Sequence, residues 1–293
     1  MVQGITGREG SAVTRYMLEY GTKILAGSTP GKKGSEVWGI PVFNSVREAS
    51  EELGPFDASV VYVPAPQAKA AIVEALDNGI KLIVAPIERF PVHDAIYAIS
   101  YAKEMGARII GPGSMGCITP GKAVLGMAGG NVEMANVVFV PGCIGILSRS
   151  GGQTTTVGYS FSQSGLGVSF ALNIGAEPIV GSNFVTLLPL LEKDPQTRGV
   201  AMFGEIGTVA EEEAAELVKA GGFTKPLVAY IAGATLPTGM RYSHASAIVE
   251  GGRGTAQSKI KALNEAGVRV VEKPNEMAPV MKALLDEKGG GKQ

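Results

Sequence analysis

Short apolar runs alternate with helix-length amphipathic stretches through the first third of the chain. The runs have the aliphatic, β-branched composition of buried strands, and patterns such as QAKAAIVEALDNG separate them. This alternation favours a parallel sheet that helices cover on both faces. The predicted strands are KILAGS (23–28), ASVVYV (58–63), KLIVAP (81–86) and ARIIG (107–111).

The alternation weakens in the middle of the chain and returns after it. Over residues 116–142, glycine, proline and short apolar pieces follow one another without a helical period. From Cys143 onward, apolar runs again precede helix-like stretches. We therefore predict an α/β protein with two open layers, residues 1–115 and 143–287, joined by a crossing segment at 116–142. The polar, glycine-rich end at 288–293 is expected to be a disordered tail.

The composition excludes several classes of partner. The net charge is −1, so the chain has no basic field that would attract a nucleic acid. No apolar stretch approaches the ~18 residues that a membrane span needs. The two cysteines lie far apart, without a CxxC pair, and indicate neither a metal site nor a disulfide framework. Because no export leader precedes VQGITG, we expect a cytoplasmic protein, or one of the mitochondrial matrix in a eukaryote.

A glycine-rich loop opens the chain. The segment GITGREG places Gly4, Gly7 and Gly10 at the start of a helix, where backbone amides can point at a phosphate. A dinucleotide site would require an acidic residue about 20 residues later, but Lys32 and Lys33 occupy that place. Positive charge there suits a ligand with an extra phosphate near its ribose, which coenzyme A (CoA) has and NAD lacks. The pattern disfavours an NAD-dependent oxidoreductase, and two solvated lysines in a turn are the alternative.

A second loop of small residues follows a predicted strand. The segment SRSGGQTTTV turns through Ser150, Gly151 and Gly152 into a helix. The free amides and the positive end of a helix favour a phosphoryl group here, although an ordinary Ser/Gly cap explains the same residues. No phosphate loop of the Walker type occurs in the sequence, so we expect another chain to bind any nucleoside triphosphate.

One of the two histidines lies among small residues. His244 stands in RYSHASAIVEGGRGT, where serine, alanine and glycine leave an imidazole ring uncovered. Glu205 ends the apolar run of FGEIG, at the sheet edge where ligands bind in open α/β folds. A carboxylate bonded to one ring nitrogen fixes the tautomer and leaves the other nitrogen as a nucleophile. With the helix that begins near Gly151, these residues predict a phosphohistidine site; a satisfied histidine and a solvated acid are the alternatives.

The remaining polar residues that stand out are interpreted as structural. His93 opens a predicted helix in the first half of the chain, far in sequence from these loops. Glu211, Glu212, Glu213 and Glu216 follow the spacing of a solvated helix face.

Eight motifs that extend from residue 2 to about residue 285 form one combination: QGITGREG, YGTKILAGSTPGKKG, GIPVFNSVREA, YVPAP, SRSGG, GEIG, DPQT and HASAIVEGGRGTA. Together they resemble the family of succinyl-CoA synthetase α subunits. The resemblance implies a Rossmann-like CoA-binding domain followed by a flavodoxin-like domain. It places the active histidine of the family on His244 and the carboxylate that supports its phosphorylated form on Glu205.

The resemblance also implies a set of binding residues and a partner. The CoA-contacting residues of the family fall on Thr6, Gly7, Arg8, Glu9, Lys32, Pro86, Ile87 and Glu88. The implied partner is a β-type subunit with an ATP-grasp fold, which would bind ATP or GTP with Mg²⁺ in an αβ or α2β2 assembly. The implied acceptor is a small carboxylic acid.

The sequence departs from the family pattern in several places, and two of them bear most directly on function. The family has SRSGTLTYEA, with a tyrosine near the carboxylate substrate, where this chain has SRSGGQTTTV and Thr155. The segments SRSGG and GMAGG are instead similar to ATP-citrate lyase, whose relatives include citryl-CoA synthetase. In addition, family members carry a longer segment ahead of QGITG. Two alternatives follow: the start codon is misassigned, or the central strand is shortened and CoA binding is weakened.

Three hypotheses result. The leading one is the α-type subunit of an NDP-forming acid–CoA ligase that makes acyl-CoA from a di- or tricarboxylate, with succinate favoured. The second is the small subunit of a citryl-CoA synthetase. The third, from another class, is a non-catalytic regulatory module that binds CoA.

Overall fold

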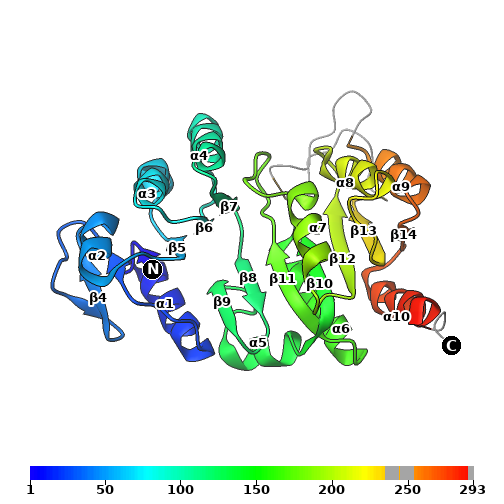
Figure 1. Ribbon diagram of the computed structural model, residues 1–293, viewed down its shortest axis with the longest axis horizontal. Helices are drawn as coiled ribbons and strands as arrows, with labels where there is room; N and C mark the ends of the chain where they lie inside the picture. Colours follow the sequence, from blue (N-terminus) through cyan, green and yellow to red (C-terminus); the bar gives the residue numbers. More distant parts are fainter. Residues whose placement is uncertain (235–243, 245–253, 290–293) are drawn as a thin grey trace.

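The computed structural model describes residues 1–234, 244 and 254–289, and in these ranges the chain forms two seven-stranded sheets (Figure 1). Both sheets are mostly parallel, and helices cover them. The prediction of an α/β protein with two successive layers is therefore confirmed.

The first sheet has the strand order β3-β4-β2-β1-β5-β6-β7, in which only the edge strand β3 is antiparallel. Numbered along the chain, its six parallel strands stand in the order 3-2-1-4-5-6, which is the Rossmann arrangement. The central strand β1 is only two residues long. The strands are β1 Val2–Gln3, β2 Gly27–Ser28, β3 Glu36–Val37, β4 Ile40–Phe43, β5 Ala58–Val61, β6 Leu82–Val84 and β7 Arg108–Ile110.

The second sheet has the order β14-β13-β12-β10-β11-β8-β9. Its five parallel strands follow the flavodoxin-like order 2-1-3-4-5 when read from β11. The hairpin β8–β9 extends this sheet, because β8 pairs antiparallel with β11. The strands are β8 Gly116–Thr119, β9 Ala123–Gly126, β10 Pro141–Ser148, β11 Val168–Asn173, β12 Gly199–Glu205, β13 Leu227–Ala232 and β14 Arg269–Val270.

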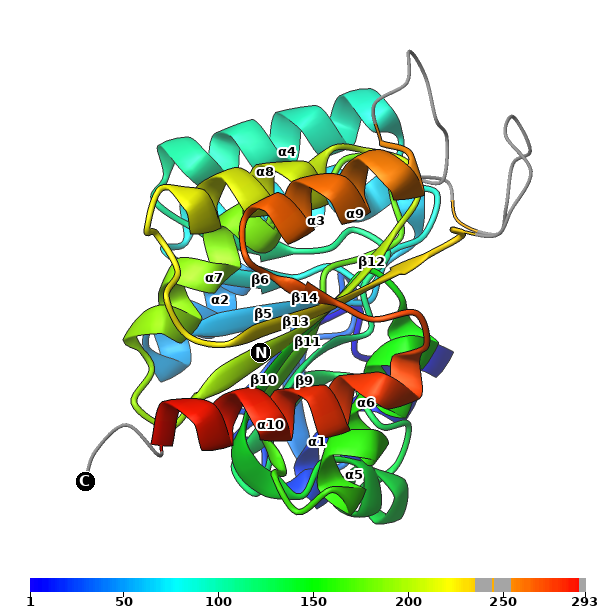
Figure 2. The ribbon, with the colours of Figure 1, turned by 90° about the vertical axis from the view of Figure 1, so that its right-hand side faces the viewer.

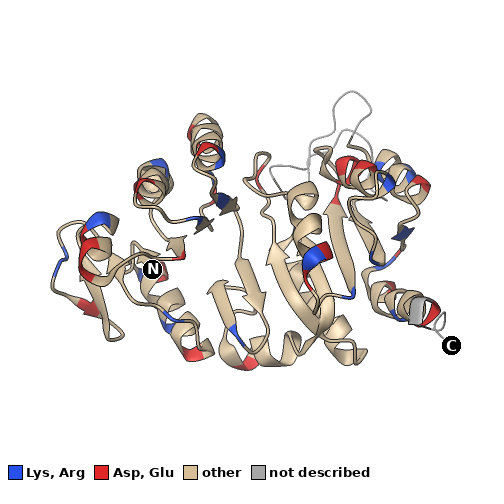
Figure 3. Cartoon of the chain, in the orientation of Figure 1, with Lys and Arg blue, Asp and Glu red and all other residues tan. Residues whose placement is uncertain are grey.

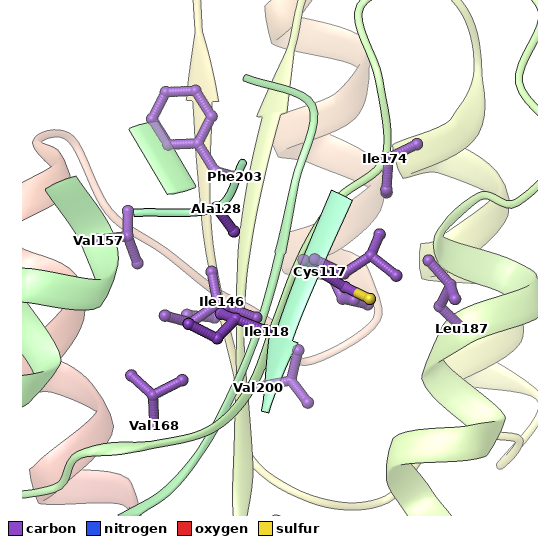
Figure 4. Packing of buried hydrophobic residues seen from close by; sticks show 14 of the residues in the cluster. Cys117, Ile118, Ala128, Ile146, Val157, Val168, Ile174, Leu187, Val200 and Phe203 are labelled. Carbon is purple, nitrogen blue, oxygen red and sulfur yellow. The ribbon is translucent and has the colours of Figure 1, made fainter. Parts of the chain in front are cut away.

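The segment 116–142, predicted as a crossing, supplies the hairpin and helix α5 to the second layer. The reason is the burial of alternate apolar side chains such as Ile118 and Val124, which are both fully buried. Figure 4 shows Ile118 beside Ile146 of β10 in the core. Each such side chain contributes about 1.5–3 kcal/mol when it leaves water, so the hairpin gains more by pairing with β11 than by spanning two domains as a loop.

Helices lie on both sides of the sheets, with α3, α4, α8 and α9 above and α1, α5, α6 and α10 below in Figure 2. Side chains cap several of them, as where Asn183 and Thr186 form a capping box at α7. None of the helices in the described ranges is long and apolar enough to cross a membrane. The helices are α1 Arg8–Tyr20, α2 Val46–Leu53, α3 Ala65–Asp77, α4 Val92–Glu104, α5 Val132–Val138, α6 Gly151–Gln163, α7 Phe184–Lys193, α8 Ala210–Lys219, α9 Ala256–Glu265 and α10 Met277–Gly289.

The two layers share one apolar cluster. Tyr16 and Met17 of α1 pack with Val124 of β9, and the Tyr16 hydroxyl donates a hydrogen bond to the Ala128 carbonyl. The Thr22 hydroxyl likewise donates to the Val124 carbonyl over 2.7 Å. Helix α1 is therefore anchored in the second layer by its end while its start faces the first sheet. The predicted tail at 288–293 begins within α10, and residues 290–293 lie outside the described residues.

Charged residues are concentrated on helices and loops, and both signs are mixed in the view of Figure 3. The predicted solvated face of α8 is only half correct: Glu213 and Glu216 are exposed, whereas Glu211 and Glu212 are buried. The first turn of α8 packs against α9 rather than facing water, and Glu211 forms an ion pair there with the fully buried Lys259. The spacing of acidic residues could not reveal this neighbour.

Replacing Lys259 by Ala should lower the free energy of unfolding by about 3–5 kcal/mol, because it leaves the Glu211 carboxylate buried without its cation. Urea denaturation measures the loss. The double variant Lys259→Met, Glu211→Gln should recover part of it, since neither of the two positions then carries a charge. Lys261→Ala, on the exposed side of the same helix, is the matched control and should leave stability nearly unchanged. Equal effects of the Lys259 and Lys261 variants would contradict this account.

Candidate active site

Glu205 is the last residue of β12, a strand that is buried along its whole length. Its backbone is held on both sides: the Glu205 amide donates to Oε1 of Glu211 over 3.1 Å, and Nζ of Lys259 donates to the Glu205 carbonyl over 2.7 Å. Lys259 also donates to the Gly207 carbonyl over 2.6 Å. The buried ion pair of Lys259 and Glu211 therefore fixes the backbone of Glu205, from which the carboxylate side chain extends.

The carboxylate of Glu205 contacts the ring of His244. Nδ1 of His244 lies 2.5 Å from Oε2 of Glu205. An ionised carboxylate only accepts hydrogen bonds, so the proton is assigned to Nδ1 and Nε2 is left as the nitrogen that can attack. The hydrogen bond to Glu205 raises the pKa of His244, against the opposing effects of desolvation and of the Arg149 charge.

Arg149 is a fully buried residue that the sequence reasoning did not assign. Its Nε lies 3.6 Å from Oε1 of Glu205, and its Nη2 donates to the Glu177 carbonyl over 3.0 Å. The guanidinium therefore balances the buried carboxylate from the side away from His244. A sequence signal for it exists, because a charged residue directly follows the apolar strand CIGILS and precedes a glycine loop. Lys259 has no such sequence signal, because it lies within a helix whose pattern of apolar and polar residues is ordinary.

Helix α6 begins at Gly151, two residues after Arg149. Ser150 occupies the N-cap position, but its side chain caps none of the helix amides among the described residues. The first turn therefore presents amides and a positive helix end to a ligand. Gly151 lies under Met115, whose sulfur would be 2.3 Å from an added Cβ, whereas an added Cβ at Gly152 meets nothing within 4 Å. Thr155 is half-buried in the second turn.

The topology places this helix and Glu205 at one edge. Strands β10 and β12 are parallel neighbours in register, with Ser148 opposite Phe203. In a flavodoxin-like sheet, the order in which successive strands are added reverses between these two strands. Ligands bind at this point, outside the carboxyl ends of the strands. His244, Glu205, Arg149 and the start of α6 are thereby brought together.

A cavity of about 850 Å³ lies at the corresponding edge of the first sheet. It is formed by the loops that follow β1, β5 and β6, with the segment 113–115 and Met127. Of the predicted CoA-contacting residues, six line it: Gly7, Arg8, Glu9, Pro86, Ile87 and Glu88. Since Met115 lines the cavity and covers Gly151, the cavity reaches from α1 toward the start of α6.

Two predicted CoA contacts lie outside this lining. The Thr6 hydroxyl donates to the Thr29 hydroxyl over 3.1 Å. Lys32 is exposed in the turn that follows β2. Its neighbour Lys33 forms ion pairs with Glu48 and Glu52 of α2. His93 is exposed on α4, away from the cavity lining. No cluster that could hold a metal ion occurs among the described residues.

Comparison with known proteins identifies the family. Residues 1–88 match the model of a CoA binding domain, and residues 147–269 match that of a CoA-ligase. Over 285 residues the chain is 49% identical to succinate–CoA ligase [ADP-forming] subunit alpha 2 of Archaeoglobus fulgidus, covering 97% of this chain and 96% of that subunit. The chain belongs to the succinate–CoA ligase α-subunit family. It is therefore a member of a family of ligases.

Other relatives differ in the acid that their names specify. The chain is 41% identical to the ADP-forming sulfoacetate-CoA ligase subunit SauD of Bilophila wadsworthia, covering 97% of this chain and 96% of that subunit. A solved structure of ATP citrate lyase from Methanothrix soehngenii in complex with citrate and CoA superposes with a TM-score of 0.90 at 25% identity. It covers all of this chain, which spans half of that longer chain.

Replacing Glu205 by Gln should lower the pKa of His244. The amide supplies no negative charge to a protonated imidazole, and the Arg149 charge then acts unopposed, so the ring should lose its proton at lower pH than in the wild type. An NMR titration of the histidine ring protons measures the shift. A His244 titration that does not move would contradict the role given to the carboxylate.

Proposed function

We propose that this chain is the α-type subunit of an NDP-forming acid–CoA ligase that works through a phosphohistidine at His244, with succinate as the favoured acid. One observation carries the proposal: Nδ1 of His244 lies 2.5 Å from the buried carboxylate of Glu205, next to the start of α6. A surface histidine with a structural role would not require a buried carboxylate balanced by a buried arginine.

The proposed reaction has three steps. The γ-phosphoryl group of ATP or GTP passes to Nε2 of His244, and the nucleoside diphosphate leaves. A carboxylate oxygen of the acid attacks the phosphorus, the P–N bond breaks, and an acyl phosphate forms. The sulfur of CoA then attacks the acyl carbon, and inorganic phosphate leaves with the thiol proton. The net products are acyl-CoA, nucleoside diphosphate and phosphate.

Each protein group has a defined task in this scheme. Glu205 holds the Nδ1 proton and so keeps Nε2 as the nucleophile, and it offsets the positive charge that phosphorylation leaves on the ring. The amides of the first turn of α6 would donate hydrogen bonds to the phosphoryl oxygens, as helix N-termini commonly do. Arg149 keeps the carboxylate ionised in a buried place.

The cavity of the first layer is the proposed binding site of CoA. The match of residues 1–88 to a CoA binding domain supports CoA as a substrate of this chain. Within the cavity, Gly7, Arg8 and Glu9 at the start of α1 would contact its phosphates, and Pro86 to Glu88 would contact the rest of the molecule. The thiol would then point toward Met115 and the start of α6, where the acyl phosphate forms. Thr6 and Lys32 are proposed as further contacts near the ribose phosphate.

The proposed partner is a β-type subunit that binds ATP or GTP with Mg²⁺, in an αβ or α2β2 assembly of the cytoplasm. The names of the relatives support it, since an α subunit implies a second one. The ATP citrate lyase chain is twice as long as the part matched by this protein, which is consistent with a fused counterpart of the partner. A non-catalytic CoA-binding module is the alternative class, and the labelling experiment below distinguishes it.

The intact complex with its β-type partner should acquire one acid-labile, alkali-stable phosphate from γ-labelled ATP or GTP. His244→Asn should abolish the label, because no nucleophilic nitrogen remains, and Glu205→Gln should slow its appearance by about 10²-fold, within the range for a positioned acid–base group. His93→Asn is the matched control and should keep the label. A wild-type complex that binds CoA but takes up no label would indicate the non-catalytic module instead.

Among acids offered to the complex, succinate should be converted to its CoA thioester at least about tenfold faster than citrate, judged by kcat/KM. The overall identity to succinate–CoA ligase subunits supports this order. The open space beside Gly152 and the small Thr155 are the features that favour a larger acid. Chromatography of acyl-CoA products from succinate, citrate and sulfoacetate measures the preference. Faster formation of citryl-CoA would establish the citryl-CoA synthetase alternative.

A further inference from the structure

Three loops, which follow β6, β7 and β11, are stacked between the CoA cavity and the candidate phosphohistidine site. The loop after β6 contains Ile87, whose carbonyl accepts from the Gly113 amide over 2.9 Å. The Gly113 carbonyl in turn accepts from the Ala176 amide over 3.2 Å, in the loop after β11. An added Cβ at Gly175 would lie 2.2 Å from the Pro112 carbonyl oxygen, so the three loops touch without space between them.

Glu177 contacts both ends of this stack. Its carboxylate accepts from the Arg89 amide over 2.8 Å, and its carbonyl accepts from Nη2 of Arg149 over 3.0 Å. Arg89 directly follows Glu88 in the cavity wall, and Nε of Arg149 faces the Glu205 carboxylate. A single residue of the second layer thus joins the wall of the CoA cavity to the charge cluster around His244.

The backbone at Arg89 needs such a partner. Its φ angle is +56°, in the left-handed region that residues other than glycine seldom occupy. A conformation of this kind persists only when its surroundings hold it. The charge-assisted hydrogen bond to Glu177 holds the Arg89 amide, and therefore the direction of the chain that leaves Pro86, Ile87 and Glu88.

We propose that Glu177 is a positioning residue that holds the CoA-binding loop 86–89 in register with the phosphohistidine site, so that the thiol arrives where the acyl phosphate forms. This inference rests on the proposed function for its catalytic consequence. Its structural part, the dependence of the loop on the Glu177 carboxylate, stands independently. Glu177 acts in CoA binding and thiol attack, and it has no part in the transfer of phosphate from nucleotide to His244.

Glu177→Ala should raise the Kd for CoA about tenfold, which is the change expected from the loss of one charge-assisted hydrogen bond. It should also speed hydrogen exchange in a peptide that covers residues 86–91. Calorimetric titration with CoA and exchange mass spectrometry measure these two effects on the full chain. Glu177→Gln keeps an oxygen acceptor and should recover most of the affinity. Glu192→Ala is the matched control: it removes a carboxylate that accepts from the Thr224 and Lys225 amides far from the cavity, and it should leave the Kd unchanged.

In the complex of the Glu177→Ala variant with the β-type partner, His244 should become phosphorylated at a rate within about twofold of the wild type. The loss of phosphate from the phosphohistidine on addition of the acid and subsaturating CoA should be about tenfold slower. A Kd for CoA and an exchange rate equal to those of the wild type would overturn the inference. Equal slowing of phosphorylation and discharge would also overturn it, because the residue would then act on the whole fold. If the wild-type complex forms no phosphohistidine, the proposed function fails, and the CoA titration and exchange still decide the role of Glu177.

Discussion

A carboxylate that is removed from water at the end of a buried strand must be balanced, and at Glu205 this requirement determines the arrangement of the surrounding segments. The desolvation cost of such a charge is several kcal/mol unless partners compensate it. The partners come from separate parts of the chain: Arg149 after β10, His244 beyond β13, and Lys259 of α9, which binds the carbonyl. Since Lys259 is itself balanced by Glu211 of α8, two anions and two cations form one buried cluster with His244 at its border. The strand ends, both helices and the histidine are consequently tied to the same small region.

The two sheets place the cavity and the charge cluster at corresponding edges. Each sheet has a point at which the strand order reverses, between β1 and β5 in the first and between β10 and β12 in the second. The cavity lies at the first point and the His244–Glu205 pair at the second. Because α1 and the β8–β9 hairpin share one core, the layers cannot be regarded as two independent ligand-binding units. Met115 contributes to both places, lining the cavity and covering Gly151.

The fold could be predicted further than the site, for a physical reason. Runs such as ASVVYV carry the apolar pattern of buried strands within themselves, so local sequence indicated the layers, and the family resemblance supplied their order. The segment 116–142 was harder, because a hairpin at a sheet edge is stabilised by β11, whose paired residues lie more than 50 positions further along the chain. Pairing His244 with Glu205 required only chemistry and the rule on strand ends. Arg149 could have been singled out as a charge between an apolar strand and a glycine loop, but its partner Glu205, the role of Glu177 and the burial of Glu211 depend on contacts between distant segments, which no local spacing encodes.

The unequal exposure of the central pair explains how a buried charge can serve a reactive group at the surface. The Glu205 side chain is 8% exposed, whereas that of His244 is 26% exposed. The carboxylate therefore acts through protein, where its attraction for the Nδ1 proton is little screened, while about a quarter of the imidazole side chain is exposed. With the exposures reversed, solvent would screen the carboxylate and weaken its hold on the proton. The arrangement keeps the proton on Nδ1 and leaves Nε2 as the unprotonated ring nitrogen, as the phosphoryl-carrier role proposed for His244 requires.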